Sequence, residues 1–320
     1  WKKIVLKFLQ AGDDPKELQV VYNTLLGELW EDRGGTVDED VMLNRREDYG
    51  TTRDGVPVEL PDGVLVLTCG VDTQNNRLEY EVVGHGLFGE TWGIKYGRIM
   101  GKPDTEEVWK RLDEVIDHVY HFKDGKSLKI SITCVDSGGN YTQDVYEACK
   151  ARQNKRVFAV KGGNKEGLPY ITPPSQVPIR TNKKRTCYLY TLGVDAGKEI
   201  IMSRVKVQEP GPKYCHYPIA EACGYDFFYF KGLLSEKLTL VRSRNGKKRW
   251  AWAIIPGHER NEALDCRNYA IAAFKILDPD MKAEQKKLRG RKDQTKRAVT
   301  RVRQVRTTYQ TNISNMYEDW

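Results

Sequence analysis

The sequence predicts an α/β domain built on one mixed sheet, flanked by helices and carrying an inserted basic β-hairpin. Three strand patterns follow one another with short connections over residues 64–99, which favours an antiparallel meander. From residue 104 onward, helical and strand patterns alternate. Alternation of this kind adds the later strands in parallel, through right-handed crossovers.

The first strand pattern, Val64–Val71, ends on an acid, Asp72. Five of the six residues from Val64 to Cys69 are apolar, so we expect the strand to be buried on both faces. Burial of a carboxylate is unfavourable unless it is paired, hydrogen-bonded or bound to a cation. Asp72 is therefore expected to have such a partner. The other strands of the meander are predicted at Arg77–Val83 and Glu90–Ile99.

A second strand pattern, Lys129–Val135, also ends on an acid, Asp136. If it lies beside the Val64 strand and parallel to it, Asp72 and Asp136 end side by side. The remaining elements are predicted as a helix at Asp104–Phe122 with Asp104 or Thr105 as N-cap, a helix at Thr142–Ala151, a strand at Arg156–Val160, a loop at Lys161–Arg185, and a strand and helix within Cys187–Val207.

A third acid, Asp265, lies in the amphipathic helix pattern Asn261–Phe274, with Glu262 one turn earlier on the same face. We expect Asp72, Asp136 and Asp265, with Glu262, to converge on divalent metal ions. Taken singly, each acid could be a cap or a surface ion pair, but all three aspartates lie beside apolar elements. Asp195, in a Gly-Val-Asp repeat of residues 70–72, is instead expected to cap a helix.

A carboxylate cluster offers hard oxygen ligands, which favour Mg²⁺ or Mn²⁺ over zinc. Two such ions, ~3.5–4 Å apart, can activate a water and stabilise the leaving oxygen of a phosphodiester. The cluster therefore predicts nuclease chemistry.

A hairpin is predicted from Leu238–Arg244 and Lys247–Ile254 around Asn245-Gly246. Its arms carry two tryptophans and five basic residues, Arg242, Arg244, Lys247, Lys248 and Arg249. Basic and aromatic residues on a projecting hairpin suit DNA binding, although charge on an exposed edge also prevents aggregation.

Composition limits the class of protein. The chain has 39% hydrophobic and 30% charged residues, and no apolar run approaches ~18 residues in length, so no segment is expected to span a membrane. The seven cysteines form no CxxC pair and are expected to be reduced and buried. Lys282–Arg306 carries eleven basic residues against two acids, so most of the net charge of +8 lies there. We expect this segment to be a mobile tail.

Three segments, LTCGVDTQNNRLEYEVVG, CVDSGGNYTQDVY and NEALDCRNYA, resemble the nuclease region of the lambda-like branch of tailed-phage terminase large subunits. The resemblance covers roughly Leu25 to Leu277. It implies a ribonuclease H-like fold and a metal-dependent endonuclease that cuts concatemeric double-stranded viral DNA in the cytoplasm of the infected bacterium. Asp72, Asp136 and Asp265 would be the catalytic acids. It also implies three partners: a terminase ATPase domain in cis, a small terminase subunit, and a portal protein docked by the tail.

The chain departs from that family in having no GxxxxGK[ST] phosphate loop, so no ATPase activity is expected of it. Because it opens on Trp1 rather than Met, we expect a fragment of a longer protein. Residues 1–60 would be a linker or strap after the missing ATPase domain, residues 61–281 the nuclease, and residues 282–320 the tail. Two alternatives stay open: another enzyme of the same fold, a resolvase or transposase, or a non-catalytic module that binds DNA or the portal.

Overall fold

The computed structural model describes residues 2–11, 20–26, 37–53, 56–163, 165, 167–180, 182–242 and 248–290. The chain divides into two compact units, Trp1–Val37 and Asp38–Trp320. The first contains helix α1 (Lys2–Ala11) and a short π-helix, η1 (Val21–Leu26). The π-helix belongs to a helical pattern that starts at Pro15; residues 15–19 of that pattern lie outside the described residues.

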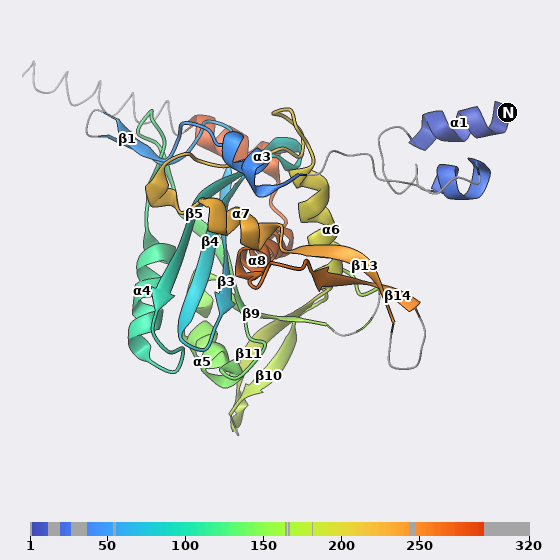
Figure 1. The fold of residues 1–320 in the computed structure, drawn as a ribbon. Helices are drawn as coiled ribbons and strands as arrows, with labels where there is room; N and C mark the ends of the chain where they lie inside the picture. The colour runs from blue at the N-terminus through green and yellow to red at the C-terminus, as the bar shows by residue number, and fades with distance from the viewer. Residues whose placement is uncertain are drawn as a thin grey trace, which may run out of the picture. The chain divides into compact units, whose positions relative to one another are not determined.

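The second unit is built on one large mixed sheet with the strand order β10-β11-β9-β8-β3-β4-β5-β12 (Figure 1). Its strands are β3 (Val66–Thr73), β4 (Arg77–His85), β5 (Thr91–Met100), β8 (Ile130–Asp136), β9 (Val157–Gly162), β10 (Ser175–Ile179), β11 (Asn182–Leu192) and β12 (Cys215–His216). Strands β3, β4 and β5 form the predicted antiparallel meander, and β8 pairs with β3 in parallel. The predicted mixed sheet, an antiparallel meander extended by parallel strands, is therefore confirmed.

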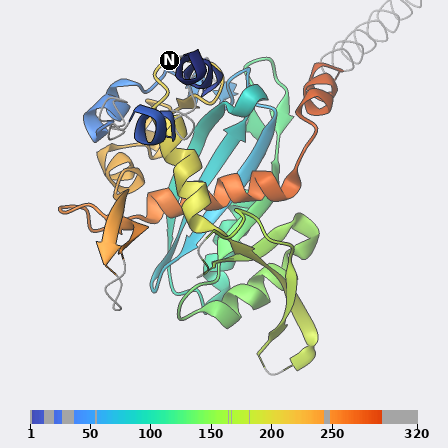
Figure 2. The same ribbon diagram turned by 90° about the vertical axis from the view of Figure 1, so that its right-hand side faces the viewer.

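Helices cover both faces of the sheet. The main helices are α4 (Glu106–Asp117), α5 (Thr142–Ala151), α6 (Val194–Val205), α7 (Phe227–Leu233) and α8 (Glu262–Leu277). Leu67, Cys69 and Val71 of β3 share one hydrophobic core with apolar residues of α4 and α5. The alternate residues of β3 face α8, which runs across the strands in Figure 2. The strand is therefore buried on both faces, as its composition predicts.

Gly70 sets the distance between β3 and α8. A Cβ at this position would lie 2.0 Å from the carbonyl oxygen of Cys266 and 2.4 Å from the amide nitrogen of Ala270. Only glycine permits that approach of two backbones. Thr68 strengthens the contact, since its hydroxyl donates to the carbonyl of Ala270 at 2.8 Å. The close approach brings the first turn of α8 toward the end of β3.

Residues 38–60 belong to the second unit and precede the strands of its large sheet. They include α3 (Glu39–Asn44), β1 (Thr51–Arg53) and β2 (Val56–Val58). Met42 and Leu60 are almost completely buried. His216 of β12 binds Glu47 at 2.6 Å and Glu90 at 2.8 Å. Burial lowers the pKa of His216, but the hydrogen bonds to these two carboxylates outweigh it and raise the pKa above its ordinary value.

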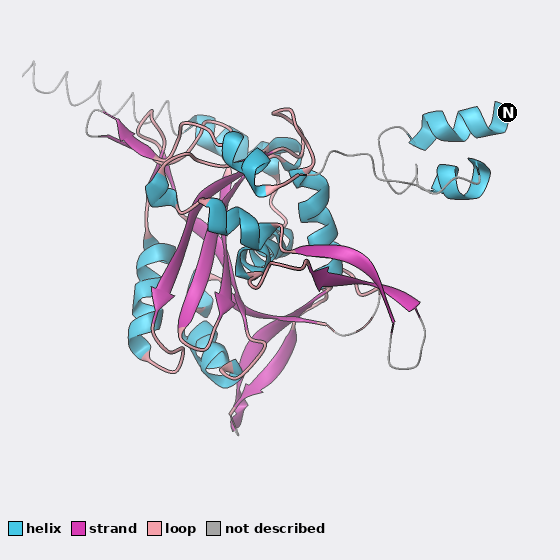
Figure 3. Ribbon diagram, in the orientation of Figure 1, coloured by secondary structure: helices cyan, strands magenta, loops and turns pink. Residues whose placement is uncertain are grey.

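The remaining elements lie outside the large sheet and its main helices. They are η2 (Leu87–Gly89), β6 (Tyr120–His121), β7 (Ser127–Leu128), η3 (Gln153–Lys155), η4 (Glu221–Cys223), β13 (Glu236–Arg242) and β14 (Lys248–Ile254). Strands β13 and β14 form a separate antiparallel hairpin that projects from the body of the unit (Figure 3). The hairpin is confirmed, while its Asn245-Gly246 turn lies outside the described residues.

Four sequence predictions need correction. The helix predicted at Asp104–Phe122 ends at Asp117, because residues 120–121 pair as β6. The loop predicted at Lys161–Arg185 contains β10, which pairs with β11. Helix α6 begins at Val194 with Gly193 as N-cap, so Asp195 lies exposed in the first turn and does not cap the helix. The segment after Met281 is helical to residue 290, and the side chain of Leu288 packs into the core.

The cysteines agree with the sequence prediction, since all seven are free and buried. None of the helices in the described parts of the chain is long and apolar enough to cross a membrane.

Candidate active site

Asp72 and Asp136 lie at the ends of neighbouring parallel strands. The pairing of Val71 with Val135 places the next residues of β3 and β8 at the same edge of the sheet. The Thr73 hydroxyl donates to the backbone carbonyl of Asp136 at 2.8 Å and joins the two strand ends. The predicted meeting of Asp72 and Asp136 is therefore present in the fold.

Asp265 comes to the same edge from the first turn of α8. Gly70 allows the helix to approach β3, and the Cys266 thiol donates to the backbone carbonyl of Glu79 at 3.3 Å. Asn261, one turn earlier, donates its side-chain amide to the Asp265 carboxylate at 3.0 Å. The backbone contacts between helix and sheet thus fix the position of the third acid.

The three aspartates share one electrostatic environment. Burial raises the pKa of Asp72 to about 8; the Gln74 hydrogen bond opposes this rise, and the charges of Asp265, Asp136 and Glu262 add to it. Burial likewise raises the pKa of Asp265 to about 7 and that of Asp136 to about 6. Each carboxylate therefore makes ionisation of the others less favourable, and a nearby cation would relieve that repulsion.

Each aspartate carboxylate accepts a hydrogen bond from the protein. The Gln74 side chain donates to Asp72 at 2.5 Å, and the Gly138 amide donates to Asp136 at 3.1 Å. Within the described ranges, no three His, Cys, Asp or Glu side chains are arranged to hold a metal ion directly. The donor set fits a hard divalent cation, since it consists of carboxylate oxygens. Ligation would require the carboxylates to turn from their present donors toward one another.

Glu262 is buried beside this group, but arginines hold both of its oxygens. Arg77 binds one oxygen at 2.8 Å and Arg260 binds the other at 3.1 Å. Glu79, which lies opposite Asp72 in the β3–β4 register, also binds Arg77 and Arg260. In the structure Glu262 is therefore part of an ion-pair network with two arginines, and its role as a metal ligand stays a prediction.

Lys198 and Glu236 are site residues that the sequence patterns did not reveal. The Lys198 ammonium binds both Glu236 oxygens, at 2.7 and 2.8 Å, and lies 3.9 Å from the Asp265 carboxylate. Asn261 bridges Glu236 and Asp265 through its side-chain amide. Lys198 and Glu236 are buried, at 8% and 7% exposure, so each charge requires the other as its counter-charge. The Lys198 charge also opposes the rise in the pKa of Asp265.

Glu236 is the first residue of β13, so the base of the hairpin adjoins the Asp265 environment. At the other end of the hairpin, Arg242 pairs with Lys248 in the strand register. The side chains of Arg242, Lys248 and Arg249 lie outside the described part of the structure, as do Arg244 and Lys247 entirely. Their predicted contact with DNA is therefore untested by the geometry.

Comparison with known proteins adds independent information. Residues 1–288 match the family model described as "Terminase large subunit gpA, endonuclease domain". The chain is 34% identical over 288 residues to the terminase large subunit of Enterobacteria phage P21 and 34% identical over 281 residues to that of Escherichia phage lambda. In both comparisons 86% of this chain is aligned, but it spans only 41% of the relative's length.

A search of solved structures found the K428A mutant nuclease domain of the large terminase subunit gp2 of bacterial virus Sf6 with manganese. The similarity covers 64% of this chain and 88% of that domain, at 12% sequence identity and a TM-score of 0.37.

Proposed function

The chain belongs to the terminase large subunit gpA endonuclease-domain family, and from this premise we propose that it is a divalent-metal-dependent endonuclease that cuts double-stranded DNA. The observation that carries the proposal is the meeting of Asp72, Asp136 and Asp265 at one edge of the sheet. The substrate would be concatemeric viral DNA in the cytoplasm of the infected bacterium.

The residues of the site have distinct tasks in this proposal. Asp72, Asp136 and Asp265, with Glu262 as a further candidate, would hold two Mg²⁺ or Mn²⁺ ions. When bound, such ions lower the pKa of an attacking water and stabilise the departing oxygen of a phosphodiester. The Lys198 charge favours the ionised form of Asp265 against the effect of burial, and Asn261 orients the Asp265 carboxylate. The backbone amide of Gly138 similarly orients Asp136.

Plasmid cleavage tests the proposal directly. We expect the chain to convert supercoiled plasmid to nicked or linear DNA with Mg²⁺ or Mn²⁺, and to lose this activity on addition of a chelator. A chain that binds plasmid but leaves it intact with either ion would be a binding module, and the proposal would be wrong. A strong preference for branched over plain duplex DNA would instead indicate a resolvase.

The basic hairpin is proposed to hold the duplex against the acids, because its base adjoins Asp265 through Glu236 and Asn261. Replacing Arg244, Lys247 and Lys248 with Ala should weaken DNA binding. The slope of log affinity against log salt should become shallower by about 0.9 for each lost phosphate contact. The measurement is a salt titration of binding to labelled duplex. An unchanged slope would leave the hairpin a structural or partner-binding role.

The partners of the whole terminase are further proposals for this chain. We expect an ATPase domain in cis, a small terminase subunit, and a portal protein that binds the basic tail. Deleting residues 291–320 keeps the packed Leu288 and should leave plasmid cleavage nearly unchanged while abolishing portal binding in a pull-down. A tenfold fall in cleavage at low salt would instead assign the tail to DNA.

A further inference from the structure

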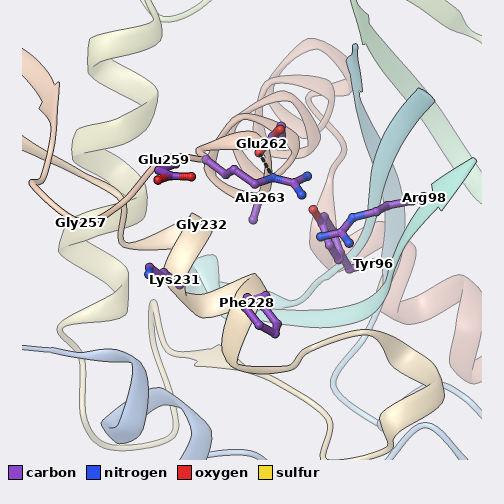
Figure 4. Close-up of a pocket in the computed structure, with 10 residues that line it drawn as sticks. Tyr96, Arg98, Phe228, Lys231, Gly232, Gly257, Glu259, Glu262 and Ala263 are labelled. Atoms are coloured by element: carbon purple, nitrogen blue, oxygen red, sulfur yellow. Dashed lines mark hydrogen bonds and ion pairs between the residues drawn. The ribbon is translucent and has the colours of Figure 1, made fainter. Parts of the chain in front are cut away.

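A pocket of about 460 Å³ opens beside the first turn of α8 (Figure 4). In this view Tyr96 and Arg98 of β5 lie on one side, and Lys231 of α7 and Glu259 lie on the other. We propose that this pocket binds a backbone phosphate of the DNA strand on the β5 side of the acid cluster. The proposal extends the proposed function by naming a second contact with the same substrate.

The sheet register places the pocket near the acids. Asp72 pairs with Glu79 across β3 and β4, and Glu79 pairs with Arg98 across β4 and β5. Adjacent strands are about 4.8 Å apart, so Asp72 and Arg98 are separated by roughly 10 Å across the sheet. Each strand of B-DNA carries one phosphate per 3.4 Å of rise along the duplex axis, so a distance of about 10 Å spans at most about three phosphates of one strand. One DNA strand can therefore span both places.

The two arginine side chains of the pocket are held in place by ion pairs and remain partly exposed to solvent. Arg98 binds the buried Glu79 through Nε at 3.3 Å, and 44% of its side chain is exposed. Arg260 binds Glu262 and Glu79, and 48% of its side chain is exposed. Lys231 has no ion-pair partner among the described residues. Carboxylates at the back of the pocket thus hold two guanidinium groups in place, while the exposed donors remain available to a phosphate.

Two other residues at the rim bear on the same ligand. Phe228 is 70% exposed and offers an aromatic face for a sugar or base beside the bound phosphate. The Glu259 carboxylate also lines the pocket and would repel a phosphate. Removing its charge should therefore strengthen DNA binding, whereas removing a cation should weaken it. A pocket that only packs against protein would not show these opposite effects.

The test measures binding of the full chain to a labelled 30-base-pair duplex in a chelator, at salt concentrations from about 50 to 200 mM. Arg98→Gln with Lys231→Gln should weaken binding at least tenfold at about 0.1 M salt and reduce the salt slope by about 0.9, the value for one lost phosphate contact. Lys231→Gln alone should reduce the slope in the same direction by a smaller amount. Because Lys231 has no described ion-pair partner, this single variant keeps the test valid if the double variant folds poorly.

The matched control is Lys110→Gln with Lys123→Gln, which removes the same charge at two exposed lysines outside the pocket. We expect the wild-type slope for this control and about twofold tighter binding for Glu259→Gln. A pocket double variant with the wild-type slope, or a control that loses as much slope as the pocket variant, would overturn the proposal. Plasmid cleavage by the wild-type chain is measured separately. If the wild type cleaves but the pocket variants keep the wild-type salt slope, only the pocket proposal is wrong. If the pocket variants have a reduced slope but the wild type does not cleave, only the nuclease proposal is wrong.

Discussion

Replacement of Asp72, Asp136 or Asp265 with Asn should in each case reduce plasmid cleavage by more than about a hundredfold. Loss of a residue that only supports a metal ligand reduces activity by up to about a hundredfold, and loss of a ligand itself should reduce it further. An amide is a weaker ligand than a carboxylate and carries no charge to balance a cation. Rates of nicking at saturating Mg²⁺ and DNA measure the effect. Full activity in any one variant would exclude that residue from the site.

Stability separates this effect from misfolding. Burial, with a smaller effect from the charges of three nearby carboxylates, raises the pKa of Asp72 to about 8. Between the ordinary pKa of an aspartate and about pH 8, the metal-free folded state binds a proton that the unfolded state releases, so Asp72 lowers stability increasingly as the pH rises through this range. Asp72→Asn should therefore raise the metal-free melting temperature at neutral pH. Asp195→Asn is the control, because Asp195 is exposed in the first turn of α6. This variant should cleave and melt like wild type.

The central part of the fold was predictable because strong local patterns determine it. The strand ending at Asp72, the strand ending at Asp136 and the helix around Asp265 were all placed correctly. Apolar runs of strand length, separated by short turns, leave few arrangements other than a meander followed by parallel strands. The juxtaposition of Asp72 and Asp136 then follows from parallel pairing alone.

The sequence could not reveal how the site is supported. Lys198 and Glu236 lie 38 positions apart, and their pairing depends on the packing of α6 against the hairpin base. No periodic pattern marks a buried lysine. The helix after Met281 was also missed, because the many charged residues there outweighed the apolar Leu288. Such contacts arise from tertiary packing, which local composition does not encode.

One buried charge pair attaches α8 to the sheet two residues beyond Asp265. Arg267 binds Glu81 of β4, and the pair is shielded from solvent, with 1% and 0% exposure. The hydroxyls of Tyr225 and Tyr229 also donate to Glu81, at 3.0 and 2.7 Å. Burial raises the pKa of Glu81, and the Arg267 charge and these hydrogen bonds oppose that rise.

Glu81→Leu should destabilise the domain by about 3–5 kcal/mol, because the Arg267 guanidinium would be left buried without a counter-charge. At about 2–4 °C per kcal/mol, the melting temperature should fall by roughly 10 °C. Arg267→Met should have an effect of similar size, since it leaves the Glu81 carboxylate unpaired. Thermal unfolding of the two variants and of the double variant measures the coupling between the residues.

The double variant Glu81→Leu with Arg267→Met should be much more stable than the sum of the single effects implies, because it removes both charges together. Its cleavage rate then tests whether the pair also positions α8. If the charge pair serves stability alone, the double variant should cleave normally below its melting temperature. If the pair sets the position of Asp265, cleavage should stay low even where the domain is folded. Strictly additive destabilisation in the double variant would show that the two charges are not coupled.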